Sequence, residues 1–447
     1  MISRRELLLR ASATGAAVLA PGALAHAQRA ADSVVGRSVD DLATDEGYWG
    51  EIQQAFTLDR TFINLNNGYC SPSPRVVHEA FKRYLDLSNQ APFTYMVQTL
   101  EPRIETVRQA LATEAGCDPE ELAITRNASE ALQTAQLGIE LEPGDEVLTT
   151  NQDYGRMLTT WEQRVRRDGI RLNKISFPVP VPGGAAELIS RIERAITPRT
   201  RIIHFCHITN LTGQIFPVRE ICALARKRGI TTIVDGAHAF AHFPYKIREL
   251  GCDYYGVSLH KWLLAPVGTG FLYVRRERIR STWPLQPAPA ALDDNIRKFE
   301  EIGTHPAANH HAIAEALVFH QAIGVERRAA RMRYLRHRWE SRLEQLPAVK
   351  LLTSRDPAQA AGIGNFSMDN VAPAVIERHL WERHRIVVVS IIHEEFQGIR
   401  VTPNIYTTIR EMDTFAGGVE RLARDGPPRS AQARHPQQLP NAASTVA

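Results

Sequence analysis

Between residues 61 and 280, the hydrophobic and polar positions follow two alternating patterns. Short runs rich in β-branched and aromatic residues predict strands at 146–150, 201–206, 231–235, 254–258 and 270–274. Between these runs the apolar residues recur at helical spacing, as they do before Gly229 at Val218, Ile221, Cys222 and Ala225. Strands that are apolar throughout need cover on both faces. The alternation therefore predicts a mainly parallel sheet between layers of helices.

From about residue 296 the pattern changes to long amphipathic helices. One of them has an apolar stripe formed by Met332, Leu335, Trp339, Leu343 and Leu346. Its other face carries Arg327, Arg328, Arg331, Arg336 and Arg342. We interpret these arginines as a solvated helix surface rather than a nucleic-acid-binding face. A strand pair near 386–391 and 400–401 follows, and a last helix has in register Met412, Phe415, Val419 and Leu422.

These changes of pattern divide the chain into expected segments. An N-terminal arm over 28–60 precedes a large α/β domain over 61–295, and a smaller α+β domain covers 296–425. The last segment, 426–447, is rich in Pro, Ala and Gln, and we expect it to be disordered.

The first segment, 1–27, has the pattern of an export signal. A basic start is followed by a short Leu/Ala/Val stretch, which Pro21 and Gly22 interrupt, and small residues lead to Ala27. The sequence SRRELL at 3–8 resembles a twin-arginine signal, with an ordinary secretory signal or a lipid-free N-terminal anchor as the alternative. We expect cleavage near Ala27 and a periplasmic protein that uses the twin-arginine export machinery.

Composition narrows the classes of partner. The 447 residues include 53 Lys and Arg and 49 Asp and Glu, and the resulting formal net charge of +4 does not favour nucleic acid or an anionic membrane. No apolar run after the leader is long enough to span a bilayer. The five cysteines are scattered, without the spacing of a zinc site or a disulfide framework. His305, His310 and His311 have no carboxylate at a matching helical offset, so we expect no metal site.

The most informative residues follow two of the predicted strands. Asp235 ends the strand at 231–235, and Lys261 comes shortly after the strand at 254–258. Ligands bind at the carboxyl ends of strands in an open α/β sheet. A lysine held in a cleft there can be neutral and nucleophilic enough to form a Schiff base, and a neighbouring aspartate can hold a cationic ring nitrogen. These are two requirements of pyridoxal phosphate chemistry.

The third requirement is a phosphate-binding segment. Residues 126–130, RNASE, precede a helical run at 131–139. Free backbone N–H groups at a helix start, together with the Ser129 hydroxyl, form an anion site. Each of the three motifs is generic alone. In this order and on these elements, they indicate a pyridoxal phosphate enzyme.

Together these residues resemble the class V aminotransferase family of fold-type I pyridoxal phosphate enzymes, which includes cysteine desulfurases and isopenicillin N epimerase-like proteins. The resemblance runs from about Asn64 to Leu422. It implies a large domain with a mainly parallel seven-stranded sheet covered by helices, and a smaller α+β C-terminal domain. It also implies that Lys261 is the catalytic, Schiff-base lysine and that Asp235 pairs with the pyridine nitrogen of pyridoxal phosphate.

The same resemblance assigns further cofactor contacts. His238 and Asn210 match the residues that contact the ring hydroxyl, and Tyr154 matches the ring that stacks on the cofactor. The expected phosphate contacts are Ala128, Ser129, Ser258 and His260. Thr304, in a Gly-Thr pair, matches a phosphate contact from a neighbouring subunit, which implies a homodimer with shared active sites.

Two further residues are assigned to the substrate. Arg400 matches the arginine that binds the substrate carboxylate, since a guanidinium offers two parallel charge-assisted hydrogen bonds. Asn67 lies in a segment, 66–68, that resembles the family's loop at the substrate site, although a tight turn would explain this segment as well.

Two departures from the family pattern bear on the reaction. A desulfurase needs a thiolate on the loop before the carboxylate-binding arginine, and 390–397 contains no cysteine. Tyr154 also replaces the histidine that desulfurases use at that position. We therefore disfavour cysteine desulfuration. His393 and Glu394 in this loop could contact substrate or could be ordinary exposed charges.

We predict a pyridoxal phosphate-dependent aminotransferase that acts on an amino acid or another amino-bearing small molecule through Lys261. An isopenicillin N epimerase-like racemase and a C–S lyase are alternatives on the same scaffold, because the site of reprotonation decides the outcome. A non-catalytic binding protein of the same fold is a third alternative, which the joint presence of Lys261, Asp235 and Arg400 disfavours.

Overall fold

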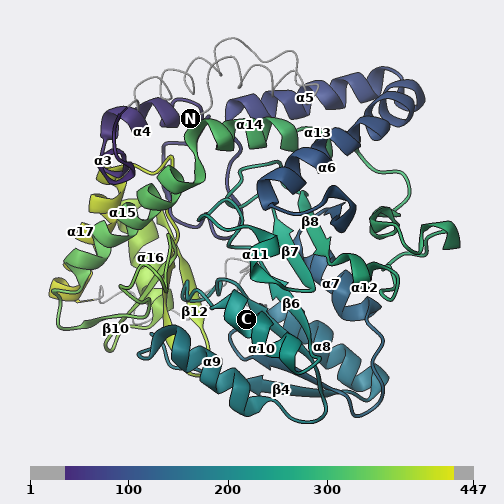
Figure 1. The fold of residues 1–447 in the computed structure, drawn as a ribbon. Helices are drawn as coiled ribbons and strands as arrows, with labels where there is room; N and C mark the ends of the chain where they lie inside the picture. Colours follow the sequence, from purple (N-terminus) through teal and green to yellow (C-terminus); the bar gives the residue numbers. More distant parts are fainter. Residues whose placement is uncertain (1–35, 427–447) are drawn as a thin grey trace.

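The computed structural model describes residues 36–426, so the expected leader over 1–27 and the tail beyond residue 426 lie outside the described residues. A seven-stranded sheet forms the centre of the larger part (Figure 1). Its strands are β2 (Leu122–Thr125), β3 (Glu146–Thr150), β4 (Arg171–Ile175), β5 (Thr200–Cys206), β6 (Thr231–Asp235), β7 (Tyr254–Ser258) and β8 (Gly270–Val274). The order is β2-β8-β7-β6-β5-β3-β4, with β8 antiparallel to both neighbours and every other pair parallel. The predicted mainly parallel sheet is confirmed.

All five strands that the apolar runs predict are present, each within one residue of the expected bounds. The two strands that the runs missed, β2 and β4, form the edges of the sheet. Arg171 and Lys174 of β4 are exposed. Strand β4 therefore lacks the continuous apolar pattern of a strand that is buried on both faces, whereas β2 is buried throughout but is only four residues long.

Helices cover both faces of the large sheet. On one face, Val147 and Ile233 pack with residues of α7 (Ala128–Gly138) and α8 (Gly155–Asp168). On the other, Leu148 and Val234 pack with residues of α6 (Glu101–Ala115), α9 (Gly184–Ala195), α10 (Val218–Lys227) and α14 (Ile313–Ile323). Further helices are α5 (Arg75–Gln90), α11 (Ile247–Leu250), α12 (Arg276–Ile279) and α13 (Ala307–His311), with a π-helix η1 (Pro92–Leu100) and 3₁₀ turns that include η4 (Ile296–Glu300). Consecutive residues of one strand thus enter different cores, as the side-chain period of two requires.

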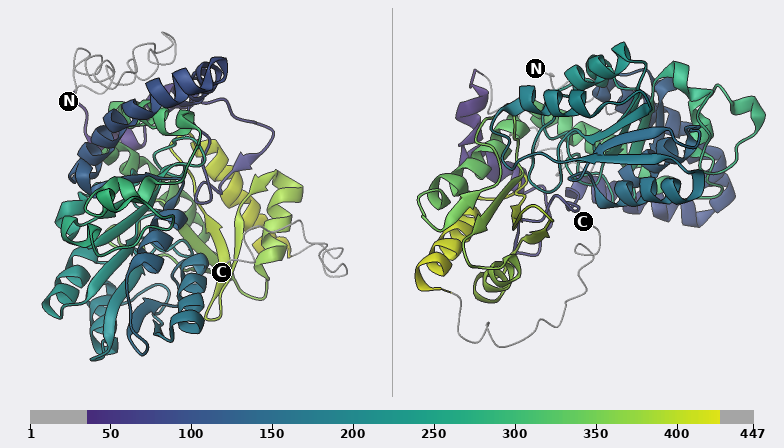
Figure 2. Two further views of the ribbon diagram at one scale, coloured as in Figure 1. Left: turned by 90° about the vertical axis from the view of Figure 1, so that its right-hand side faces the viewer. Right: turned by 90° about the horizontal axis from the view of Figure 1, so that it is seen from below.

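The smaller part is built on a four-stranded antiparallel sheet of order β12-β13-β10-β9. Its strands are β9 (Val349–Leu351), β10 (Gly364–Met368), β12 (Val389–Ile392) and β13 (Gln397–Val401). The helices that share its core are α15 (Val325–Leu343), α16 (Pro373–His384) and α17 (Ile409–Asp425). A two-stranded parallel sheet joins β1 (Ile63–Asn64) to β11 (Ile386–Val387). Figure 2 shows from two further sides that this part lies beside the large sheet.

The segments between the two sheets pack with the larger part. Helices α13 and α14 contact α5 and α6, and α15 contacts the N-terminal helix α3 (Val39–Ala43), which is followed by α4 (Glu46–Gln53). The core of the large part continues to Met332, and the core of the small part includes Leu335. The division at residue 296 stays a prediction.

Within residues 36–426, no helix has the length and hydrophobicity needed to cross a bilayer.

The arginine face of α15 differs from the sequence-based interpretation. Arg328, Arg331 and Arg336 have no exposed surface. Arg331 donates from Nη1 to the Ala43 carbonyl (3.1 Å) and from Nη2 to the Thr407 carbonyl (3.2 Å). The prediction of a solvated surface is therefore wrong for these three arginines, because segments distant in the sequence cover them.

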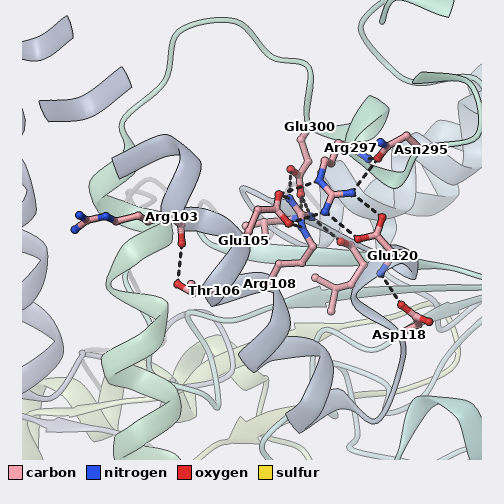
Figure 3. Close-up of polar contacts among 11 residues, drawn as sticks. Arg103, Glu105, Thr106, Arg108, Asp118, Glu120, Asn295, Arg297 and Glu300 are labelled. Atoms are coloured by element: carbon pink, nitrogen blue, oxygen red, sulfur yellow. Dashed lines mark hydrogen bonds and ion pairs between the residues drawn. The ribbon is translucent and has the colours of Figure 1, made fainter. Parts of the chain in front are cut away.

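A cluster of ion pairs holds η4 against the edge of the large sheet (Figure 3). The Arg108 side chain, which is 1% exposed, binds both Glu105 and Glu300. Arg297 donates to Glu105 (2.6 Å) and Glu120 (2.7 Å). Bidentate arginine–carboxylate pairs fix geometry well. The cluster thus holds the segment that immediately precedes the Gly-Thr pair at 303–304.

Candidate active site

A cavity of about 450 Å³ opens at the carboxyl ends of β5, β6 and β7, and β13 of the small part also reaches it. Most residues that the sequence assigns to the site line this cavity. They are Ala128, Ser129, Tyr154, Asn210, Asp235, His238, Ser258, His260, Lys261 and Arg400. The fold therefore brings together residues that are spread over more than half of the chain.

Lys261 lies in the turn between β7 and β8, with Nζ 3.1 Å from Nε2 of His238. Its side chain keeps some accessible surface because it faces the cavity, while protein surrounds it on the other sides. Burial lowers the pKa of Lys261 to about 8, with Asp235 opposing this shift and Arg400 adding to it. A substantial fraction of the amine is therefore neutral near pH 8 and can act as a nucleophile or base.

Asp235 ends β6 beside this amine. Its Oδ1 accepts a hydrogen bond from the Ala237 N–H (2.9 Å), and burial raises the pKa of the carboxyl to about 6. A cationic group brought to Asp235 would favour the ionised form again. The protonated ring nitrogen of pyridoxal phosphate is such a group.

His242 holds the histidine beside the lysine in place. Its Nδ1 hydrogen-bonds the His238 carbonyl (2.8 Å), and its Nε2 accepts from the Gly362 N–H of the small part (2.8 Å). Because a carbonyl only accepts, Nδ1 carries the proton. The ring also stacks on Trp262, with 3.9 Å between centroids. His242 thus joins the two parts of the molecule directly behind Lys261.

The start of α7 has the features of a phosphate-binding segment. Asn127 caps the helix by accepting from the Glu130 N–H (2.8 Å), and the Ala128 N–H donates to the Ser258 hydroxyl (3.0 Å). A Cβ on Gly270 would come within 2.7 Å of the Asn127 backbone, so glycine permits this close approach of β8.

His260 lies at the same end of the cavity. Its Nδ1 is 3.2 Å from the Thr269 carbonyl, and burial lowers its pKa to about 4. Nδ1 therefore carries the proton of the neutral ring, and Nε2 is left as an acceptor. A phosphate dianion beside the ring would raise this pKa and favour a second proton.

Arg400 enters the cavity from β13 of the small part. Nη1 donates to the Asn210 carbonyl and Nη2 to Oδ1 of Asn66, both at 3.0 Å. Burial lowers the pKa of Arg400 to about 10. Among residues 36–426 no carboxylate pairs with this guanidinium, so its charge is available to an anionic ligand.

Three buried polar atoms around the cavity have no partner within the described range. They are Nδ1 of His238, Oδ1 of Asn210 and Nε of Arg400. Buried polar atoms are normally hydrogen-bonded, so these three favour a polar ligand at this position. With an enclosed amine, an enclosed carboxylate and a helix start, the donor set fits pyridoxal phosphate.

Asn67 and Thr304 do not line the cavity. The Asn67 side chain is fully buried, accepts a hydrogen bond from the Tyr406 hydroxyl and donates to the Thr402 carbonyl (2.9 Å). Asn66, its neighbour, is the residue that contacts Arg400. Thr304 is exposed on the loop after η4, and its contact with a second subunit stays a prediction.

The cavity also contains residues that the sequence did not single out. They are Tyr69, Cys70, Leu132, Gln133, Arg156, Cys206 and Val267. Cys70 follows the 66–68 segment closely, and this neighbourhood could have suggested it. An arginine at a helix start is too common for Arg156 to stand out. His393 and Glu394 do not line the cavity and contact Asn151 instead, at 3.1 and 3.0 Å.

Comparisons with known proteins agree with this geometry. The family described as "Aminotransferase class-V" matches residues 63–410. The isopenicillin N epimerase of Streptomyces clavuligerus is 32% identical over 391 residues, which cover 84% of this chain and 98% of that protein. A probable cysteine desulfurase of Methanothermobacter thermautotrophicus is 24% identical over 402 residues, with 84% and 98% covered.

Two similar solved structures are of one protein, C-DES, one with its reaction product and one with its cofactor. The cystine C-S lyase C-DES, in complex with cysteine persulfide, has a TM-score of 0.72 and 26% identity, with 81% of this chain and 98% of that chain covered. A second structure of C-DES holds glycine covalently linked to its pyridoxal phosphate cofactor. Relatives of this chain therefore include an epimerase, a desulfurase and a lyase.

Proposed function

Because this chain belongs to the class V aminotransferase family of pyridoxal phosphate enzymes, we propose that it is an aminotransferase that acts on an amino acid or a related amine. The observation that carries the proposal is the enclosed Lys261 amine, which has a pKa of about 8 and shares one cavity with the Asp235 carboxylate and the Arg400 guanidinium. A general base works best when its pKa lies near the operating pH.

Each part of the cofactor has residues suited to hold it. The start of α7, with Ser129, Ser258 and His260, would bind the phosphate, and Asp235 would hold the proton of the ring nitrogen. When bound, pyridoxal phosphate accepts the electron pair that is released at the substrate Cα. Tyr154 lines the same space and would cover one face of the ring.

The remaining steps belong to side chains of this protein. Arg400 binds the substrate carboxylate and so fixes the orientation of Cα. The neutral Lys261 amine takes the Cα proton and returns it to another carbon. His238, 3.1 Å from Nζ, keeps the amine directed into the cavity. Transamination would need this proton to be placed on a carbon of the bound cofactor, whereas epimerisation would need a proton donor on the face of Cα opposite Lys261.

Epimerisation is the second candidate, because 32% identity to an isopenicillin N epimerase extends over nearly the whole of that protein. Desulfuration is disfavoured on physical grounds. Cys70 and Cys206 line the cavity, but burial raises the pKa of both thiols, which reduces the thiolate needed for attack on sulfur. Turnover that persists in a Cys70→Ser variant would support this view.

The test is incubation of the purified holoenzyme with amino acids in deuterated water. Keto acid with pyridoxamine phosphate supports transamination, and deuterium at an inverted Cα supports epimerisation. Pyruvate release identifies a lyase, and alanine together with a protein-bound persulfide identifies a desulfurase. Borohydride reduction followed by peptide mass spectrometry should place the cofactor on Lys261. A holoenzyme without an adduct at Lys261 would overturn every version of the proposal.

We also propose that the active protein is a homodimer. Tyr69 and Val267, at the mouth of the cavity, are 52% and 65% exposed, and Phe93 of η1 is 67% exposed. The Val267 carbonyl binds Asn309 of α13, which itself contacts η1. A second copy would bury these apolar side chains and could bring its Thr304 to the phosphate.

Export is proposed from the leader alone. We propose that the folded, cofactor-loaded protein reaches the periplasm by the twin-arginine route, since this route translocates folded proteins. Sequencing the N-terminus of periplasmic protein should find a start near Gln28. Replacement of Arg4 and Arg5 by lysine should retain the precursor in the cytoplasm, and normal export of that variant would exclude the route.

A further inference from the structure

Besides Arg400, a second arginine without a carboxylate partner among the described residues lies at the rim of the cavity. Arg156 is the second residue of α8 and lines the same space as Arg400. Its Nε is 3.3 Å from the Tyr154 hydroxyl, and no carboxylate pairs with it in the part of the chain that the structure describes. Other arginines nearby are paired, as Arg126 is with Glu130 (2.7 Å). Arg156 is thus a cation that the protein leaves available at the mouth of the site.

Arg156 and Arg400 approach the cavity from different parts of the molecule. Arg156 comes from α8 of the large part, and Arg400 comes from β13 of the small part. The Tyr154 phenol lies near both arginines. It accepts a hydrogen bond from Arg156, and it is close enough to Arg400 to affect the pKa of that guanidinium. The two cations therefore face the same region of the cavity, beside Tyr154.

The cavity contains little negative charge to balance these cations. Among residues 36–426, Asp235 is the only carboxylate that lines it, and the cationic ring nitrogen of the cofactor would neutralise that carboxylate. The expected phosphate contacts at the start of α7 come from serines, a histidine and backbone N–H groups. A ligand with one carboxylate would satisfy Arg400 and leave Arg156 without a counter-ion.

We propose that the substrate is dianionic: an amino acid, or an amino-acid-like compound, with a second carboxylate that Arg156 binds while Arg400 binds the carboxylate next to the amine. The inference rests on the proposed function, and it specifies the substrate class of that site. A planar guanidinium matches a carboxylate with two parallel hydrogen bonds. Because Arg156 is at the exposed rim, its contribution is modest and affects selectivity more than total affinity.

The test compares straight-chain dicarboxylates from succinate to pimelate with monocarboxylates of equal length, by calorimetric titration of the holoenzyme. The best dicarboxylate should bind about fivefold more tightly than its matched monocarboxylate. Arg156→Gln should abolish this preference without affecting the visible absorbance of the cofactor. Arg166→Gln, an exposed arginine further along α8, removes the same charge away from the cavity and should keep the preference.

Each opposite result overturns the proposal. Equal affinities in the wild-type protein, or a preference that Arg156→Gln leaves unchanged, show that no second anion is recognised by this residue. Loss of bound cofactor in Arg156→Gln assigns the guanidinium to the phosphate instead. The titration measures carboxylate binding without turnover. It therefore tests the substrate class independently of whether the enzyme transaminates amino acids. A dicarboxylate preference without turnover would overturn the proposed function alone.

Discussion

At the scale of single residues, the charge state of Lys261 depends on its surroundings. Burial removes water from the ammonium form and lowers its pKa to about 8, while the neighbouring charges act in opposite directions. Asp235 favours the charged amine, and Arg400 disfavours it. The protein thus holds the amine near the point where proton transfer in both directions is easy.

This balance predicts opposite effects of two substitutions. Apoprotein should react with pyridoxal at a rate that rises with pH and reaches half its maximum near pH 8, because only the neutral amine attacks. Asp235→Asn removes a charge that raises the pKa of Lys261, so the midpoint should move to lower pH. Arg400→Gln removes a charge that lowers this pKa, so the midpoint should move to higher pH.

Borohydride trapping at each pH, with the Lys261 peptide quantified by mass spectrometry, gives the midpoint for each variant. Shifts of the same sign would contradict this account.

Asn66 offers a second test at the residue scale. Its neutral Oδ1 orients Arg400 at 3.0 Å without cancelling the positive charge. Asn66→Asp places a carboxylate at the same distance, which the substrate carboxylate would have to displace. We expect KM to rise about tenfold or more, with a small change in kcat. Asn66→Ala removes the acceptor but adds no charge, so its KM should rise less. Steady-state kinetics of both variants measures the two changes in KM. Equal increases would show that Asn66 acts only by orienting Arg400 and that the added charge has no effect.

At the scale of elements, α15 connects the N-terminal arm and the C-terminal segment to both cores. Arg331 accounts for much of this connection. Besides its bonds to the Ala43 and Thr407 carbonyls, it pairs with Glu46 at 2.6 Å and lies over the Trp49 ring. The helical spacing of its apolar residues predicts the apolar stripe of this helix. The burial of Arg331 could not be predicted in this way, because α3 and α4, which cover it, are distant in the sequence.

Arg331→Ala should therefore destabilise the protein strongly. It leaves two buried carbonyls without their donor and removes a buried guanidinium, at a cost of about 3 kcal/mol. Arg333→Ala on the same helix is the matched control, because Arg333 is half-buried and has no hydrogen bond or ion pair among the described residues. Its effect should stay within about 0.5 kcal/mol. Urea unfolding followed by circular dichroism measures both, and similar midpoints for the two variants would contradict the role of Arg331.

At the scale of the whole molecule, the site is assembled from two parts that each fold around their own core. Lys261 and Asp235 belong to the large sheet, Arg400 belongs to the small sheet, and His242 joins the two parts through Gly362. Tyr69 and Val267 are exposed apolar residues at the mouth of the cavity, and a second copy would cover them in the proposed dimer.

The dimer can be tested without altering the site. Phe93→Glu places a charge on the exposed face of η1, where burial against a second copy would become unfavourable. We expect a monomer, with weaker retention of cofactor, at concentrations where the wild-type protein is a dimer. Ile392→Glu, at a side chain that is 51% exposed on β12, is the control and should stay dimeric. Sedimentation velocity distinguishes the species, and a monomeric wild-type protein would rule out the shared site.

The sequence by itself determined five of the seven strands of the large sheet and the chemistry at the ends of two of them. Apolar runs identify the inner strands β5, β6 and β7. Asp235 ends β6 and Lys261 follows β7, so their meeting at one sheet edge follows from the parallel pairing of these strands. Tertiary structure decided what depends on contacts between distant segments. It placed Asn66 rather than Asn67 against Arg400, buried Arg331, and left Arg156 unpaired at the rim. Period and motif specify a residue's neighbours along the chain, whereas its partners and its exposure depend on which distant segments fold over it.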